Sequence, residues 1–301
     1  MDAPIVVTSA LEVTDSAFYI LDAPARDVKV FTRTGEPVRV IGRPGPGPGE
    51  FRFPVGMAIE GTQLYVADDA QLRVSVFTAV GEFVRSIPLP PGTYTDLAVL
   101  DDGTLALAGR LPTRDTQPTR VPTMHFISRD GTYQGSSARR EPPTHPYERA
   151  AAGIFLARSG DRLCSATRTS NVGVEYDRAT GRVTYDTLAA GRYRPVEWLT
   201  SAPPGGDTKQ FIDWWKSQTR TLFVVGVPDG ACLVEFYDPL ASPHHYVTLL
   251  ERDRRTATID GVDAQLETAL ADTVFGVARG DDGTITVIRY LLKTHEPRSR
   301  G

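Results

Sequence analysis

The sequence predicts an all-β fold, a six-bladed β-propeller of four-stranded antiparallel blades, with one or two short helices in insertions between blades. Three observations lead to this prediction: an internal repeat of 46 residues, six short apolar hairpins, and glycine-containing turns at equivalent places in the hairpins. The 301 residues are 41% hydrophobic, which is enough to bury a large core. Because propellers of this length form one domain, we expect residues 1–301 to be a single unit.

The repeat is read from two segments that align without a gap. Tyr19–Arg39 (YILDAPARDVKVFTRTGEPVR) matches Tyr65–Arg85 (YVADDAQLRVSVFTAVGEFVR) at a constant offset of 46 residues. A period of about 40 to 50 residues with strand-like alternation is typical of propeller blades. The two segments are therefore predicted to be consecutive blades.

Between these copies lies RPGPGPGEFRFP, residues Arg43 to Pro54. Its glycines recur at every second residue, which excludes the collagen repeat, and a linker between different domains is excluded because both sides are copies of one unit. We predict that it crosses from the outermost strand of blade 1 to the innermost strand of blade 2. Phe51 is expected to wedge between the blades, and Pro54 to begin a strand where its missing N–H costs little.

These residues resemble a known family. Gly47–Phe83 (GPGEFRFPVGMAIEGTQLYVADDAQLRVSVFTAVGEF) is similar to the NHL repeat of six-bladed β-propellers, and Leu11–Gly42 resembles it less closely. The resemblance implies the propeller fold and transfers no catalytic residue, since the repeat motif is structural. It also favours a periplasmic or other extracytoplasmic location, which bacterial propellers of this kind frequently have.

Six hairpins are read as the two innermost strands of six blades. Their turns lie near Asp15, Gly61, Asp102-Gly103, Gly160-Asp161, Asp229-Gly230 and Asp282-Gly283. Only Leu291–Gly301 remains after the last hairpin, which is too short for two outer strands. The spare apolar segment Ile5–Thr8 is therefore expected to pair into the final blade and close the ring.

Charge and hydropathy narrow the function classes. A formal net charge of −4 argues against general nucleic-acid binding. No apolar run approaches the roughly 18 residues that a membrane-spanning helix needs. The first residues, MDAPIVVTSA, lack the features of a signal peptide, which fits a cytoplasmic protein or a mature exported one.

The two cysteines, Cys164 and Cys232, occupy similar places in two predicted second strands. Equivalent positions of neighbouring blades need not lie within disulfide reach. We predict two buried thiols.

Long connections are expected to gather on one face of the ring. In a propeller, the turns within each blade's two hairpins lie on one face, whereas the other connections lie on the opposite face. All the long segments belong to the second kind: Gly42–Val55, Arg110–Pro122, Ser137–Ala152, Ala189–Arg220 and Arg252–Asp272. Because binding sites accumulate on loops held by a rigid scaffold, the functional surface is predicted on this face.

The insertion of residues 189–220 contains all three tryptophans of the chain, Trp198, Trp214 and Trp215. Within it, GGDTKQFIDWWKSQT predicts a short helix with Asp207 or Thr208 as its N-cap. Its aromatic side chains either cover the blade beneath or anchor a partner protein, a membrane surface or a hydrophobic ligand. A second, amphipathic helix is predicted from Asp260, in the insertion of residues 252–272.

The excess of arginine is the second feature, after the tryptophans, that indicates a binding surface, since 29 of the 33 basic residues are arginine. Either a GC-rich genome explains this bias, or the guanidinium groups serve bidentate contacts to carboxylate or phosphate. The predicted partner-binding residues combine both signals: Trp198, Phe211, Trp214, Trp215, Arg52, Arg114, Arg139, Arg140, Arg192 and Arg194.

No catalytic residue, metal site or cofactor is predicted. His145, His244 and His245 lie in predicted loops and have a chemistry that suits zinc, but their spacing is not that of a ligand set. The predicted function is a non-catalytic scaffold that holds a partner protein, with a membrane surface or an anionic ligand as other partners. The alternatives are a propeller hydrolase or lyase with an axial metal and, least favoured, RNA binding.

Overall fold

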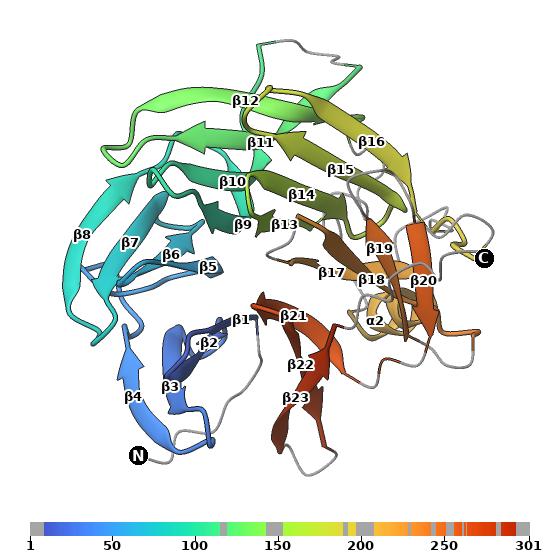
Figure 1. Ribbon diagram of the computed structural model, residues 1–301. Coiled ribbons are helices and arrows are strands. Elements are labelled where there is room, and N and C mark those ends of the chain that lie inside the picture. Colours follow the sequence, from blue (N-terminus) through green and yellow to red (C-terminus); the bar gives the residue numbers. More distant parts are fainter. Residues whose placement is uncertain are drawn as a thin grey trace, which may run out of the picture.

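The structure is a computed structural model that describes residues 9–114, 119–142, 153–188, 192–196, 208–227, 230–241, 245–250, 256–260, 262, 264–280 and 284–292. Six antiparallel sheets are arranged around a central axis, with their innermost strands at the centre (Figure 1). The chain is therefore a six-bladed β-propeller, as the repeat predicts.

The strands follow the chain in blade order. Blade 1 contains β1 (Ala10–Val13), β2 (Ala17–Asp22), β3 (Asp27–Thr32) and β4 (Pro37–Ile41); blade 2 contains β5 (Pro54–Glu60), β6 (Gln63–Asp68), β7 (Arg73–Thr78) and β8 (Phe83–Pro88); blade 3 contains β9 (Thr93–Val99), β10 (Leu105–Arg110), β11 (Val121–Ile127) and β12 (Tyr133–Arg140). Blade 4 contains β13 (Ile154–Ser159), β14 (Arg162–Thr167), β15 (Val172–Asp177) and β16 (Val183–Thr187); blade 5 contains β17 (Arg220–Gly226), β18 (Cys232–Tyr237), β19 (His245–Leu250) and β20 (Thr256–Asp260); blade 6 contains β21 (Gln265–Leu270), β22 (Thr273–Arg279) and β23 (Ile285–Leu291). The helix α2 (Thr208–Lys216) lies between blades 4 and 5 in the chain.

The core lies between neighbouring blades rather than within one sheet. The middle strands β2, β6 and β10 are buried along their whole length, apart from their end residues Gln63 and Arg110, because each is covered on both faces by adjacent blades. One cluster joins blades 1 and 2 through Tyr19, Val28 and Met57, and another joins blades 2 and 3. Stacking of this kind explains why the apolar pattern of these strands is continuous.

The segment of residues 43–54 is a joint between blades 1 and 2, as predicted. Phe51 is fully buried in the cluster of blades 1 and 2 and meets Phe77 edge-on at 5.8 Å. Its N–H donates to the carbonyl of Arg43 and its carbonyl accepts from Gly45. Gly42, with φ of +79°, leaves the Phe51 ring room that a Cβ would occupy, so sequence and packing agree here.

Blades 1 and 6 complete the described ring. Their innermost strands β1 and β21 contact each other, and Phe18 meets Phe275 at 5.9 Å, with the Arg33 guanidinium over both rings. The described part of blade 6 is a three-stranded sheet. The predicted closing segment, Ile5–Thr8, lies outside the described residues.

Two predictions for the C-terminal region are wrong. The segment predicted as a helix from Asp260 contains the end of β20 and the strand β21, so the segment of residues 252–272 is not one long insertion. The hairpin read as the innermost pair of blade 6 is β22–β23, and the innermost pair is β21–β22 with its turn at Ala271-Asp272. Val262, Leu266 and Leu270 are four residues apart, a spacing that satisfies both helical and strand periodicity.

The prediction of two free thiols is also wrong. Cys164 on β14 and Cys232 on β18 form a disulfide, with their Cα atoms 6.5 Å apart. Both side chains are buried in the cluster between blades 4 and 5, which also contains Phe155, Leu188 and Phe236. Two cysteines that face one blade interface from opposite sides do come within reach, and the strand pattern alone did not reveal this.

Candidate functional site: the axial cavity and the loop-bearing rim

The innermost strands of the six blades meet at the centre of the molecule (Figure 1). A cavity of about 930 Å³ lies between them. Each of β1, β5, β9, β13, β17 and β21 contributes to its wall. Concave sites where several elements converge are the usual places for ligands. The cavity is therefore one candidate for a binding site, and the rim around it is another.

Four carboxyl residues line the cavity, and the three that stand on innermost strands form what we call the acidic belt: Glu12 on β1, Asp96 on β9 and Glu267 on β21. They come from blades 1, 3 and 6. None of the three was predicted as a site residue from the sequence. The signal was present, since each is an acidic residue inside an innermost strand that is otherwise largely apolar (LEV, TDLAV and LETAL).

Local irregularities of the strands help to place this belt. In β21 the pairing with β22 shifts between Leu266 and Thr268, so Glu267 is the extra residue of a β-bulge. In β9 the pairing with β10 shifts at Thr95, next to Asp96. Bulges re-aim side chains and concentrate beside functional sites.

The three carboxyl groups differ in their hydrogen bonds. Asp96 accepts from the backbone N–H of Leu97 and, across to blade 4, from that of Leu156, both at 2.8 Å. Glu267 accepts a hydrogen bond at Oε1 from the Gln265 side chain at 2.7 Å. Its other oxygen, Oε2, has no hydrogen-bond partner, and it is buried, since Glu267 is only 9% exposed. A buried carboxylate oxygen without a partner is costly.

Burial raises the pKa of all three groups. The pKa of Glu12 rises to about 8, first through desolvation and then through the charge of Asp96. Desolvation raises the pKa of Asp96 to about 7, although its two backbone hydrogen bonds act in the opposite direction. The pKa of Glu267 lies well above its ordinary value because of desolvation, and Glu235 and Asp96 add to the rise. Glu12 and Asp96 therefore exchange protons near neutral pH.

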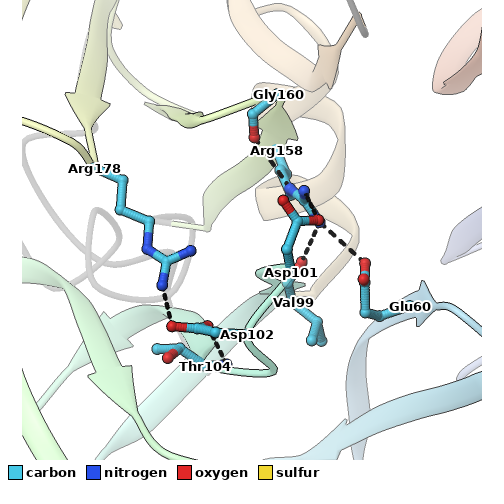
Figure 2. A network of polar contacts seen from close by, with 8 residues as sticks. All are labelled: Glu60, Val99, Asp101, Asp102, Thr104, Arg158, Gly160 and Arg178. Atoms are coloured by element: carbon cyan, nitrogen blue, oxygen red, sulfur yellow. Dashed lines mark hydrogen bonds and ion pairs between the residues drawn. The ribbon is translucent and has the colours of Figure 1, made fainter.

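A polar network borders the cavity at the end where the short hairpin turns lie (Figure 2). Arg158 donates to Glu60 of blade 2 at 3.0 Å, to Asp101 of blade 3, and to the carbonyls of Val99 and Gly160. Nearby, Arg178 of blade 4 pairs with Asp102 of blade 3. The network ties three blades together, and its carboxylates hold the positive charge of Arg158 at this end.

At the opposite end, the cavity wall contains Tyr94, Asp69, Arg110 and Arg168. Asp69 accepts a hydrogen bond from the Tyr94 backbone N–H at 2.6 Å, which links blades 2 and 3. Arg168 lies over the Phe155 ring, 5.1 Å from its centroid, and desolvation lowers its pKa. Arginine side chains therefore lie at both ends of the cavity, and the acidic belt lies between them.

The connections at the end of the cavity that contains Tyr94 and Asp69 form what we call the loop-bearing rim. The turns that join the first strand to the second and the third strand to the fourth in each blade lie on the opposite side, and they span at most five residues. Four of the five long segments named from the sequence are connections whose described ends lie on the loop-bearing rim: β4–β5, β10–β11, β12–β13 and β16–β17. The fifth, residues 252–272, is divided by strands.

The helix α2 stands in the β16–β17 connection and carries the aromatic cluster that the sequence indicated. Phe211 and Trp214 lie 5.5 Å apart, and Trp214 and Trp215 lie 5.9 Å apart. All three side chains are half-buried, and the neighbouring Ile212 is 42% exposed. Arg220 fixes the base of the helix, since it lies over the rings of Trp215 and Tyr237 and donates to the carbonyls of Trp215 and Gln218.

The other predicted partner-binding residues separate into two groups. Arg192 lies over the Tyr246 ring at 4.5 Å, Arg194 pairs with Asp238, and Arg140 donates to the Val172 carbonyl of blade 4. These three contact the propeller itself. Arg52, Arg114 and Arg139 are exposed, and Trp198 lies outside the described residues.

The two histidines in the described part of the chain, His125 and His245, stand on third strands of their blades and not at the axis. His125 is buried in blade 3 at 3.3 Å from the Gly109 carbonyl oxygen, and burial lowers its pKa. His245 Nδ1 lies 2.7 Å from Glu235, whose other oxygen accepts from the Leu266 N–H of blade 6. His145, His244 and His295 lie outside the described residues. Within the described ranges, no three His, Cys, Asp or Glu side chains are close enough to hold a metal ion.

The fold and this cavity define the class of protein, a six-bladed β-propeller. In the comparison with protein families, a family described as 6-bladed beta-propeller (DUF5128) matches residues 2–117. Comparison with curated proteins finds no match. Within the described residues, no helix is long and apolar enough to cross a membrane.

Solved structures with the same fold come from several bacteria. One is a candidate exported protein from Bacteroides fragilis, with 15% identity and a TM-score of 0.63, covering 91% of this chain and 80% of that one. Another is a member of the DUF4221 family from Bacteroides vulgatus, with 11% identity and a TM-score of 0.63, covering 95% and 94%. A third is virginiamycin B lyase from Staphylococcus aureus, with 11% identity and a TM-score of 0.53, covering 97% and 88%. Identities this low show a common fold and no common activity.

Proposed function

We propose that this protein is a non-catalytic, extracytoplasmic binding protein that holds a partner protein on its loop-bearing rim. The observation that carries the proposal is the helix α2, which presents Phe211, Trp214 and Trp215 half-buried beside the exposed Ile212. Its base is held by Arg220, so the aromatic side chains are pre-positioned. Rigid aromatic groups bordered by apolar surface are the usual anchors of protein interfaces.

The arginines Arg52, Arg114 and Arg139 lie in or beside other connections of the loop-bearing rim, in blades 1 to 3. Each is exposed, so each is available for bidentate contacts to carboxylate groups. Arg192, Arg194 and Arg140 support the rim from below through their contacts with the propeller. A partner with an apolar segment for α2 and acidic side chains for these arginines fits the loop-bearing rim.

Two observations support an extracytoplasmic location. The Cys164–Cys232 disulfide joins blades 4 and 5, and structural disulfides persist in oxidising compartments. The propellers of similar structure include a candidate exported protein from Bacteroides fragilis. The 46-residue repeat further supports blades of the NHL type.

Affinity capture from the native organism tests the partner-binding proposal. The wild type, the double variant Trp214→Ala/Trp215→Ala and the control variant Val80→Ala, on the opposite rim, serve as baits. We expect one protein to be recovered at equal yield by the wild type and the control, and at least about tenfold less by the double variant. Equal recovery by all three baits would remove α2 as the anchor, and recovery of lipid vesicles alone would replace the protein partner with a membrane surface.

A second candidate, a propeller hydrolase or lyase, is favoured by one observation. The pKa of Asp96 lies at about 7 in a cavity, which suits a residue that transfers protons near neutral pH. This candidate predicts turnover of an ester, lactone or lyase substrate that Asp96→Asn abolishes without loss of folding. A panel of such substrates with no turnover above the rate of Asp96→Asn removes it.

A further inference from the structure

The acidic belt carries an inference that does not depend on the loop-bearing rim. Asp96 and Glu267 belong to blades 3 and 6, which lie opposite each other in the ring (Figure 1). The charge of Asp96 nevertheless acts on Glu267 and on Glu12. The three carboxyl groups therefore face one shared space along the axis.

The belt is not neutralised from within the described part of the protein. The charged side chains that line the cavity or act on the belt are Glu12, Asp69, Asp96, Arg110, Arg158, Arg168, Glu235 and Glu267. Arg158 is engaged by Glu60 and Asp101 at one end, and Arg110 and Arg168 lie at the other. The charges that act most strongly on Glu12 and Glu267 are those of other carboxyl groups, which disfavour ionisation.

Glu267 gives the independent indication of a ligand. Its side chain is about nine-tenths buried, lines the cavity from a β-bulge, and has one oxygen with no hydrogen-bond partner. Proteins rarely leave such an atom unpaired, because its desolvation is not compensated. A donor that enters the cavity from outside would satisfy it.

The size of the site selects the kind of donor. No three acidic, histidine or cysteine side chains of the described residues come close enough to share a metal ion, so the belt is too wide for one small cation. A cavity of about 930 Å³ accommodates a larger group, and Met57, Leu97 and Leu156 supply apolar wall beside the carboxyl groups. We propose that the axial cavity binds an organic cation that spans the width of the belt, with its ammonium or guanidinium nitrogens paired to the carboxylates of Glu12, Asp96 and Glu267.

The site has a defined dependence on pH. A bound cation stabilises the ionised carboxylates, so binding must displace the protons that the empty belt retains. With pKa values of about 8 for Glu12 and about 7 for Asp96, affinity rises as the pH increases from about 6 to about 8. Proton release on binding is a direct sign of these groups.

Isothermal titration calorimetry on the purified chain tests the proposal, with 1,4-diaminobutane as a small-molecule probe and the peptide acetyl-Gly-Arg-Gly-amide as a probe for a side chain of a partner. We expect at least one probe to bind, and the tighter one identifies the source of the cation. Glu267→Gln should weaken binding by about tenfold or more, whereas Glu82→Gln, an exposed control on the β7–β8 turn, should leave it unchanged. Titration in two buffers of different ionisation enthalpy should show that protons are released.

Several outcomes would overturn the proposal. They are no binding of either probe at millimolar concentration, equal binding of neutral 1,4-butanediol, equal binding by Glu267→Gln, and displacement of the diamine by stoichiometric Ca²⁺. Folding of the variant is checked by thermal melting, where relief of carboxylate repulsion should leave Glu267→Gln at least as stable as the wild type at neutral pH. Glu12→Gln provides the second variant and should weaken binding in the same direction.

Discussion

The disulfide between blades 4 and 5 should contribute a large part of the stability of this half of the ring. Cys164 and Cys232 are separated by 68 residues, and a cross-link that closes a loop of this length lowers the entropy of the unfolded chain. The chain-entropy relation gives about 4 kcal/mol at 25 °C for such a loop. The bond also lies in the packed cluster that contains Phe155 and Phe236, so its loss removes buried contacts as well.

We therefore expect the double variant Cys164→Ala/Cys232→Ala to unfold with about 3–5 kcal/mol less free energy than the oxidised wild type. For a two-state transition of the whole chain, a loss of about 4 kcal/mol corresponds to a melting temperature about 6 °C lower. Urea unfolding followed by tryptophan fluorescence measures the difference. A thiol reductant provides the matched control, since it should destabilise the wild type by a similar amount and leave the double variant unchanged.

The direct chemical check is alkylation of the urea-unfolded protein without reductant, followed by intact mass. The wild type, purified from an oxidising compartment, should take up no label. Labelling of both cysteines, or equal stability of the oxidised wild type and the double variant, would refute the reasoning and remove the argument for an extracytoplasmic location.

Three further predictions concern charged and aromatic contacts. Burial raises the pKa of Glu12 from its ordinary value near 4 to about 8, so between these pH values the folded state binds more protons than the unfolded state, and the free energy of unfolding should fall as the pH rises from about 4 to about 8. Urea unfolding at several pH values measures this dependence. Glu12→Gln should flatten it, and an unchanged slope would contradict the prediction. Arg158→Ala should lower the free energy of unfolding by about 1–2 kcal/mol in the same assay, because it removes contacts to blades 2 and 3. Arg178→Ala removes one exposed ion pair and should lower it by less than about 1 kcal/mol. Equal losses would argue against the role of Arg158 as a bridge between blades. Arg220→Ala should loosen α2 without changing the global stability. The expected signs are a red shift of the tryptophan fluorescence and faster tryptic cleavage near the helix. An identical spectrum would show that other contacts hold the helix.

The N-terminal half of the fold was predictable because its blades repeat local rules. The 46-residue offset places Asp22 and Asp68 at equivalent positions at the ends of β2 and β6, and both are fully buried. Asp68 accepts from the backbone N–H groups of Arg52, Phe53 and Gln71, so it fixes the joint that precedes its own blade. Such contacts are short in sequence, and their residue types are specific.

The C-terminal half depends on contacts that a local pattern does not encode. In β21 the bulge at Glu267 interrupts the alternation of the strand, so a spacing of four suggested a helix. The disulfide and the acidic belt both arise where different blades face each other, Cys164 against Cys232 and Asp96 across from Glu267. The residue types were visible in the sequence, but their partners were set by the closing of the ring.

The central claim is that the loop-bearing rim, with α2 as its anchor, is the surface that holds a partner. Site-specific photo-cross-linking in the native organism tests it most directly, with benzoylphenylalanine at Ile212 on α2 or at Val80 on the opposite rim, which are 42% and 60% exposed. We expect a discrete cross-linked species from position 212 that position 80 does not give. Cross-links of equal yield from both positions, or from position 80 alone, would contradict the claim.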